Sequence, residues 1–266
     1  MTLLGSDAIA EKETVAAPYD PLAPHYDAFN SAPEYEDWLA ALLQLAAEHG
    51  LDGGLALDVG CGTGRSVAAL LSAGFEASGV DPSPGMLEVA RERLGAGVEL
   101  GVSTLPEPLP IGPKLDLVTA FGDVLNYIEP EMLSRSMTVL ADRLRPGGLL
   151  LFDANTQLVF TTFFGTAHVR DAGERFFVWD PLAQDDPTYS ADLHAFVAAP
   201  DGDPSGWIRT VSRHVQHRHP HERIVEALDD AGLELLTTRG AHESGELDLV
   251  ADDARHIKRI YLARLS

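Results

Sequence analysis

The chain has 266 residues, of which 45% are hydrophobic, and carries a formal net charge of −22 at pH 7. This length and composition allow a sizeable core and exclude general disorder, while so acidic a surface disfavours a nucleic-acid backbone as partner. No apolar run reaches the roughly 20 residues that a membrane helix needs. A single cysteine, Cys61, excludes an intrachain disulfide, so we expect a cytoplasmic protein.

The N-terminal part precedes any regular pattern. Residues 1–17 lack the basic start and apolar core of a secretory signal, and we expect a flexible leader there. The next segment, 18–29, contains two Tyr-Asp pairs, which begin at Tyr19 and Tyr26. A helix is predicted over 34–50, because its leucines form a broad apolar face that Gly50 closes.

Beyond this helix, short apolar strands alternate with helical segments. We expect strands at 55–59, 75–80, 97–102, 115–121 and 149–153, and helices at 65–73, 84–94 and about 131–144. A helix at 221–231 and strands at 234–238 and 257–265 complete the pattern. Strands separated by helices predict an α/β fold with a doubly wound, seven-stranded, mostly parallel sheet that has helices on both faces.

One long insertion, 156–219, interrupts this alternation after the fifth strand. Three strands are expected in it, at 174–179, 189–198 and 207–217, separated by turn signals at Pro181 and at 200–206. They predict an antiparallel β cap between a core over 18–155 and the C-terminal part of the core sheet over 220–266. The cap can contact a substrate, form a homo-oligomer interface, or do both.

A glycine-rich turn follows the first strand of the alternation. The sequence Leu-Asp-Val-Gly-Cys-Gly-Thr-Gly ends at Gly64, and Asp81 ends the next strand. Glycines let the backbone turn tightly and let a ligand lie against bare main chain. An acid at the end of the second strand is placed to accept both hydroxyls of a ribose. The pattern therefore predicts a nucleoside-containing cofactor in a βαβ unit.

The spacing of this turn distinguishes between cofactors. It is G-x-G-x-G, with Asp58 two residues before Gly60, rather than the G-x-G-x-x-G of dinucleotide-binding oxidoreductases. It resembles motif I of the class I S-adenosylmethionine (SAM)-dependent methyltransferases. Over about 19–265, the plan resembles the small-molecule N-methyltransferases that modify amino sugars and other secondary metabolites. The resemblance implies a Rossmann-like methyltransferase fold, SAM as cofactor and S-adenosylhomocysteine as product.

The resemblance also implies how the cofactor is held. Gly60, Cys61 and Gly62 would supply backbone near the methionine portion, and Asp81 would accept the ribose hydroxyls. Phe121, at the end of the fourth strand, would offer its carbonyl to the SAM ammonium.

Adenine contacts and closure of the site are implied in the same way. Met86 would lie against the adenine face. The acid that the family often has after the third strand is absent, and Ser103 and Thr104 stand there instead. Tyr19 and Tyr26 would close over the cofactor, although each can also be an ordinary half-buried aromatic residue.

Methyl transfer needs mainly proximity and alignment from the protein. An amine acceptor has only to arrive neutral, whereas a hydroxyl acceptor usually needs a general base. Candidates are Tyr127 and Asp123 after the fourth strand, although Asp123 can equally cap a helix. His217 is the candidate from the histidine-rich segment 212–221, in which we expect a base or a solvated strand and no metal.

The sequence therefore predicts a SAM-dependent methyltransferase that acts on an amine of a small molecule. Transfer to a hydroxyl, and SAM binding without catalysis, are the alternatives. We expect neither a nucleic acid nor a membrane as partner.

Overall fold

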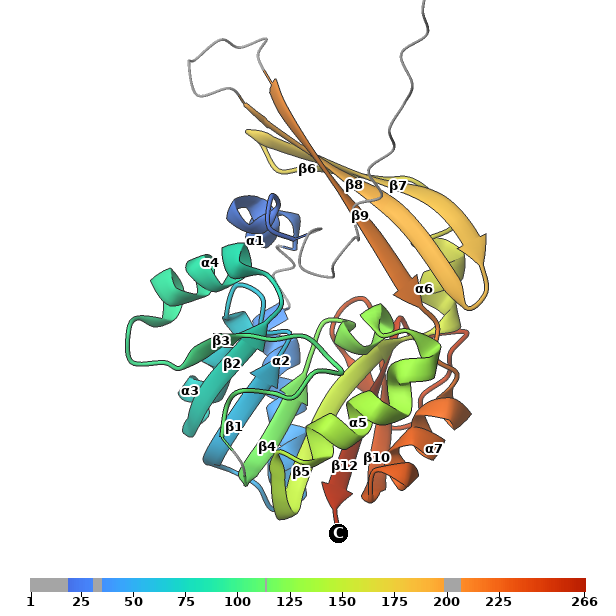
Figure 1. The fold of residues 1–266 in the computed structure, drawn as a ribbon. Coiled ribbons are helices and arrows are strands. Elements are labelled where there is room, and N and C mark those ends of the chain that lie inside the picture. The colour runs from blue at the N-terminus through green and yellow to red at the C-terminus, as the bar shows by residue number, and fades with distance from the viewer. Residues whose placement is uncertain (1–18, 31–34, 113, 199–206) are drawn as a thin grey trace, which may run out of the picture.

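An eight-stranded, mostly parallel sheet forms the core of the computed structural model, which describes residues 19–30, 35–112, 114–198 and 207–266 (Figure 1). The expected leader and the turn at 200–206 lie outside these residues. The strand order is β11-β10-β12-β5-β4-β1-β2-β3, with β10 to β12 antiparallel to their neighbours. The strands are β1 Gly54–Val59, β2 Phe75–Asp81, β3 Leu100–Val102, β4 Leu115–Ala120, β5 Leu144–Asn155, β10 Leu233–Ala241, β11 Leu247–Asp248 and β12 Lys258–Leu265.

Helices cover both faces of this sheet, which confirms the predicted fold class, although the two-residue β11 adds an eighth strand to the seven that the sequence predicts. Neighbouring residues of a strand point to opposite faces, so Leu117 and Val118 of β4 enter two different cores. Leu117 packs with α2, α3 and α4, and Val118 with α5 and α7. These helices are α2 Tyr35–Glu48, α3 Arg65–Ser72, α4 Pro84–Leu94, α5 Leu133–Ala141 and α7 His221–Asp230.

The insertion after β5 begins with a short helix, α6 (Gln157–Thr162), and forms a separate antiparallel sheet. This cap has four strands where the sequence predicts three: β6 His168–Asp171, β7 Arg175–Asp185, β8 Thr188–Ala198 and β9 Trp207–His217. The expected break at Pro181 is wrong, because β7 continues through it at an irregularity in its pairing with β8. A strand tolerates proline at such a bulge.

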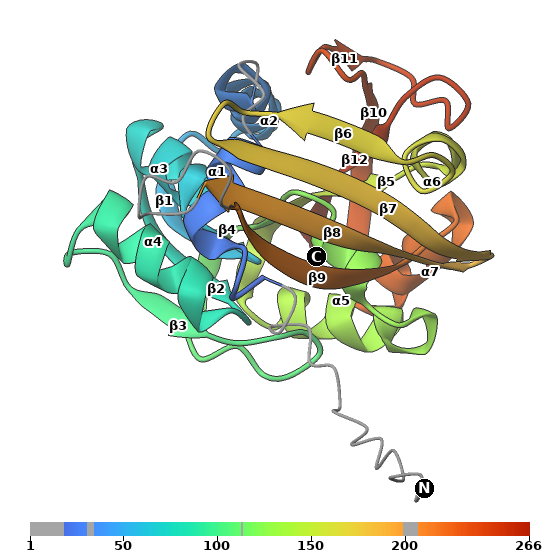
Figure 2. The ribbon, with the colours of Figure 1, turned by 90° about the horizontal axis from the view of Figure 1, so that it is seen from above.

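The cap lies over the N-terminal segment, which contains a 3-10 helix, η1 (Ala23–His25), and α1 (Tyr26–Phe29) (Figures 1 and 2). Phe177 and Trp179 of β7 pack in one apolar cluster with Leu22 and with Phe160 and Phe164. Their burial fixes the cap sheet to both the N-terminal segment and the region of α6. The cap therefore lies above the carboxyl ends of the parallel strands (Figure 1).

Smaller differences concern the ends of elements. The third strand is shorter than expected, and α5 follows two short 3-10 helices, η2 (Val124–Tyr127) and η3 (Pro130–Met132). β5 already begins at Leu144, five residues before the predicted start of this strand at 149, so it includes Pro146 and Gly147. Its pairing with β4 shifts register in this stretch, which accommodates them. No helix in the described part of the chain is long and apolar enough to cross a membrane.

Candidate active site

A pocket opens at the carboxyl ends of β1, β2 and β4, beneath the N-terminal segment. It encloses about 960 Å³ of empty space, which includes open solvent at its mouth. Eleven of the predicted site residues line it: Tyr19, Tyr26, Gly60, Cys61, Gly62, Asp81, Met86, Ser103, Thr104, Phe121 and Tyr127. Asp123 and His217 are not among the described lining residues.

The floor of the pocket is the glycine turn after β1. Gly60 has a φ of +73°, and a Cβ there would lie 2.4 Å from a methyl carbon of Val124. The amides of Gly60 and Cys61 both donate to the carbonyl of Val80, at 2.8 and 3.0 Å. The Cys61 thiol packs against Gly79, and burial raises its pKa, so Cys61 is a small residue that fits the turn.

Asp81 joins this turn to the end of β2. Its Oδ2 accepts the amide hydrogen of Gly62 at 2.8 Å, and its Oδ1 accepts that of Ser83 at 2.8 Å. Burial raises the pKa of Asp81 to about 6, although both amides oppose this shift. A carboxylate has about four acceptor positions, so each oxygen can accept a further hydrogen bond from a ligand hydroxyl.

Asp58 lies below the turn and ties three elements together. It accepts hydrogen bonds from Thr119 Oγ1 on β4, at 2.6 Å, and from Ser66 Oγ on α3. The carboxyl group is fully buried, which raises its pKa to about 7 despite these donors. Asp58 therefore supports the turn from beneath rather than facing a ligand.

We expect this buried acid to make stability fall as pH rises. The pKa of Asp58 in the folded protein is above its unfolded value near 4, so its contribution is present at low pH and lost as pH rises through 7. Asp58 contributes at most about 1.4 kcal/mol per pH unit to the change in the free energy of unfolding. Urea unfolding at pH 5 to 8 should show this decline in the free energy of unfolding and a flatter curve for Asp58→Asn. Parallel curves for the two proteins would contradict the assignment.

Two aspartates hold the N-terminal segment over the pocket. Asp20 accepts hydrogen bonds from Ser83 Oγ at 2.5 Å and from the amide of Gly85 at 3.0 Å. Asp27 accepts one from Thr63 Oγ1 at 2.7 Å and pairs with the Arg93 guanidinium. The sequence interpretation considered only the tyrosines of the two Tyr-Asp pairs, but the repeated acid was itself a signal.

A tyrosine–histidine chain, formed by Tyr19, Tyr127, His214 and Ser212, lies at the top of the pocket. The Tyr19 and Tyr127 hydroxyls are 2.6 Å apart, and Tyr127 Oη lies 3.0 Å from His214 Nδ1. His214 Nε2 lies 3.1 Å from Ser212 Oγ. Burial raises the pKa of both tyrosines and lowers that of His214 to about 4, so all these groups are neutral near pH 7.

Asp123 takes part in a buried charge cluster behind the pocket wall. Lys258 Nζ lies 2.5 Å from Asp153 Oδ2 and 3.3 Å from Asp123 Oδ1. Asp153 also accepts the amides of Gly122 and Asp123, at 2.6 and 3.0 Å. Burial lowers the pKa of Lys258, but the two carboxylates outweigh this and raise it. Asp123 precedes η2 but its side chain makes no capping hydrogen bond, so the structure does not give it the alternative role of a helix cap.

His217 lies among structural partners. Its Nδ1 is 3.0 Å from Thr188 Oγ1, and its Nε2 is 3.4 Å from Glu129 Oε2. Its carbonyl accepts a hydrogen bond from Asn126 Nδ2 at 2.8 Å. The histidine of β9 that reaches a pocket-lining side chain is His214, which the sequence interpretation did not select.

The class I methyltransferase fold is a doubly wound sheet with a glycine turn after its first strand and an acid at the end of its second strand. An N-terminal segment covers the site in this fold, as it does here. Residues 56–148 match the family model described as a methyltransferase domain. A Geobacillus sp. (strain WCH70) protein named as a methyltransferase is 28% identical over 225 residues, covering 82% of this chain and 90% of the relative.

Solved structures agree. A S-adenosylmethionine-dependent methyltransferase from Clostridium acetobutylicum superposes with a TM-score of 0.79 at 24% identity, covering 93% of this chain and 99% of that one. The sugar N-methyltransferase KedS8 from Streptoalloteichus sp. shares the fold with a TM-score of 0.69 at 20% identity, covering 99% and 98%. The chain is a SAM-dependent methyltransferase with the class I fold.

Proposed function

We propose that this enzyme transfers the methyl group of SAM to an amine of a small molecule, such as an amino sugar of secondary metabolism. The observation that carries this proposal is the neutral tyrosine–histidine chain at the top of the pocket. Among the described lining residues, Asp81 supplies the carboxylate, and it faces the glycine turn. A neutral amine needs no strong base, which suits such surroundings.

The lining residues fit SAM part by part, in the roles that the sequence resemblance implies. Asp81 accepts the ribose hydroxyls, and Met86, Ser103 and Thr104 hold the adenine. The Phe121 carbonyl accepts from the ammonium, while the backbone of Gly60, Cys61 and Gly62 lies along the methionine portion. Tyr26, together with Tyr19, closes the site.

Arg65 adds a partner for the SAM carboxylate that the sequence interpretation missed. It lines the pocket, stacks 4.0 Å from the Tyr35 ring centre and donates to the carbonyl of Asn30 at 2.9 Å. Three of its five guanidinium N–H groups donate to Glu36 and Asn30, so two remain for an anion.

SAM supplies an electrophilic methyl group on a sulfonium leaving group. The protein aligns the acceptor nitrogen with it and excludes water beneath the cap. With Tyr127 donating to His214 Nδ1, and Tyr19 donating to Tyr127, the Tyr19 oxygen is left as an acceptor facing the pocket. It can accept a hydrogen bond from the amine N–H and orient the nitrogen lone pair, and the methylated ammonium can lose its proton to water when the product leaves.

The likeness to a sugar N-methyltransferase supports this class of acceptor through the fold and the shared extent of the chain. For Asp123 and His217 we propose supporting roles, since the first pairs with Lys258 and the second with Thr188. A cytoplasmic location, the absence of a nucleic-acid partner and a homo-oligomer through the cap stay predictions.

Substitutions in the tyrosine–histidine chain distinguish an amine acceptor from a hydroxyl acceptor. If the acceptor is an amine, each of the substitutions Tyr127→Phe and His214→Gln should reduce kcat by much less than the ~10²- to 10⁴-fold that is typical of removing a general base. S-adenosylhomocysteine formation would be measured with aminodeoxy sugars and with their hydroxyl analogues. The pH–rate profile should follow the ionisation of the amine.

Asp123→Asn and His217→Ala serve as matched variants outside the pocket, and they should reduce stability more than kcat. Near-complete loss of turnover in a folded Tyr127→Phe or His214→Gln protein that still binds SAM would favour O-methylation and contradict the amine proposal.

A further inference from the structure

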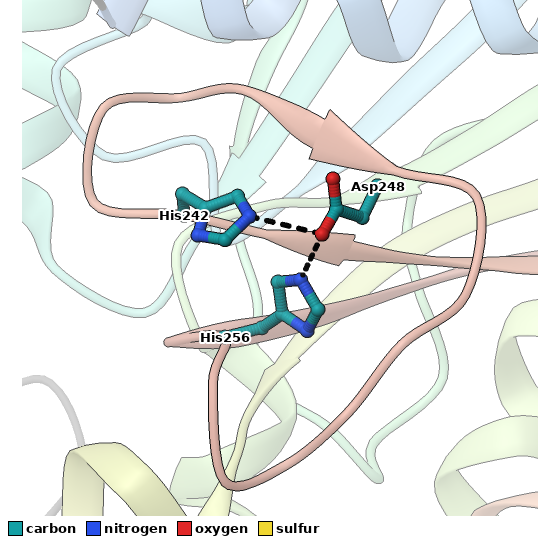
Figure 3. Close-up of side chains that lie close together, drawn as sticks. All are labelled: His242, Asp248 and His256. Atoms are coloured by element: carbon teal, nitrogen blue, oxygen red, sulfur yellow. Dashed lines mark hydrogen bonds and ion pairs between the residues drawn. The ribbon is translucent and has the colours of Figure 1, made fainter.

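A second cluster of chemically capable side chains lies at the far edge of the core sheet. His242 follows β10, Asp248 ends β11, and His256 lies in the loop before β12; Figure 3 shows the three side chains converging. Asp248 Oδ2 lies 3.1 Å from His242 Nε2 and 2.9 Å from His256 Nε2. None of the three is among the described residues that line the SAM pocket.

The spacing of these atoms is close to that of metal ligands. One ligand atom from each residue lies within 4.8 Å of the others. Zinc binds imidazole nitrogen at about 2.0–2.1 Å and carboxylate oxygen at about 2.0–2.2 Å, so ligand atoms around a tetrahedral ion are roughly 3.3–3.5 Å apart. The two nitrogen–oxygen distances are a few tenths of an ångström shorter, so small side-chain movements admit an ion.

Backbone groups of Asp252 hold the His256 ring in place. Its ring is fully buried, and its Nδ1 accepts the amide hydrogen of Asp252 at 2.9 Å and lies 3.0 Å from the carbonyl oxygen of the same residue. Metal binding needs the other tautomer, in which Nδ1 carries the proton and donates to the Asp252 carbonyl, so that the lone pair of Nε2 points at Asp248. A second-shell carbonyl of this kind fixes the tautomer and orientation of a ligating imidazole.

The backbone is also shaped around this ring. A Cβ at Gly240 would lie 2.4 Å from His256 Nδ1, although the φ of Gly240 is one that other residues adopt. The glycine in β10 is therefore required by the imidazole and not by the strand. The backbone of β10 therefore leaves space for the His256 ring at a fixed position.

We propose that His242, Asp248 and His256 form a binding site for a divalent transition metal such as Zn²⁺, with an open position for water. Two imidazoles and a carboxylate form a set of ligands that suits such ions better than it suits Ca²⁺ or Mg²⁺. The competing cation, the Arg255 guanidinium at 3.9 Å from Asp248, is exposed and free to turn to solvent. A bound ion would clamp β11, which pairs with β10 through only two residue pairs, to the loop that leads into β12.

The test is a Zn²⁺ titration of the full chain without a histidine tag, by calorimetry against a competing chelator and in excess Mg²⁺. We expect one saturable site with a Kd of roughly 1 μM or tighter. His242→Gln and Asp248→Asn should each weaken binding at least about tenfold. Gly240→Ala should weaken it too, although it retains all three ligands, because its methyl group displaces the His256 ring. His49→Gln, at the end of α2, is the control and should bind as the parent does.

Stability gives an independent measurement. Zinc at 100 times its Kd should raise the Tm by roughly 5 °C in the parent and in His49→Gln, and much less in folded His242→Gln and Asp248→Asn. Binding with unchanged affinity in both ligand variants, or no saturable site in the parent, would overturn the proposal and leave Asp248 as an acceptor of two imidazole hydrogen bonds.

Discussion

Replacing Asp81 with alanine is expected to weaken SAM binding about 100-fold or more. We propose that its carboxylate accepts both ribose hydroxyls, and hydrogen bonds to a charged group contribute roughly 1.5–3 kcal/mol each. A loss near 3 kcal/mol corresponds to about two orders of magnitude in Kd. The substitution also frees the amides of Gly62 and Ser83, which loosens the turn that the ligand contacts. Calorimetric titration with SAM measures the effect.

Two companion variants separate charge from shape. Asp81→Asn keeps the shape of the side chain and loses its charge, so its affinity should fall between those of the parent and the alanine variant. Asp142→Ala removes an exposed acid after α5 and should bind SAM normally. If a folded Asp81→Ala protein bound SAM as tightly as the parent, Asp81 would have no place in the cofactor site.

Replacing Lys258 with methionine is expected to destabilise the protein by about 3–5 kcal/mol, because it leaves largely buried carboxylates without their cation. Asp153 is fully buried and Asp123 is 26% exposed. Burial already raises the pKa of Asp123, and Lys258 opposes this shift. Without Lys258 the folded protein should bind protons more tightly, so the deficit should be largest near pH 8 and shrink as pH falls. Urea unfolding across this range measures it.

The matched control is Arg145→Met, which breaks the pair between Arg145 and Asp116. That arginine is 44% exposed, and such surface pairs contribute about 1 kcal/mol or less. A deficit for Lys258→Met no larger than that of the control, or one independent of pH, would show that Lys258 does not stabilise the two carboxylates.

Elements with local signals could be predicted from the sequence. Helix α4 has the predicted bounds because Ser83 caps it, accepting the amide of Met86 at 3.1 Å, Pro84 suits its first turn and Gly95 follows its end. The glycine turn could be predicted for the same reason, since Gly60 takes a backbone conformation that other residues rarely adopt.

What the sequence could not predict depends on residues far apart in the chain. β6 is four residues long and is held by its pairing with β7. Lys258 is separated from Asp123 by 135 positions, so no local pattern connects them. His214 and His217 are equally plausible in a histidine-rich strand, and only the packing of β9 against the Tyr127 region decides which one reaches the pocket.

A crystal structure with S-adenosylhomocysteine bound tests the central claim most directly. The account predicts the ribose hydroxyls on the Asp81 carboxylate, the adenine beside Met86, and the sulfur facing the space below Tyr19 and Tyr127. S-adenosylhomocysteine bound outside this pocket, or with its ribose turned away from Asp81, would contradict it.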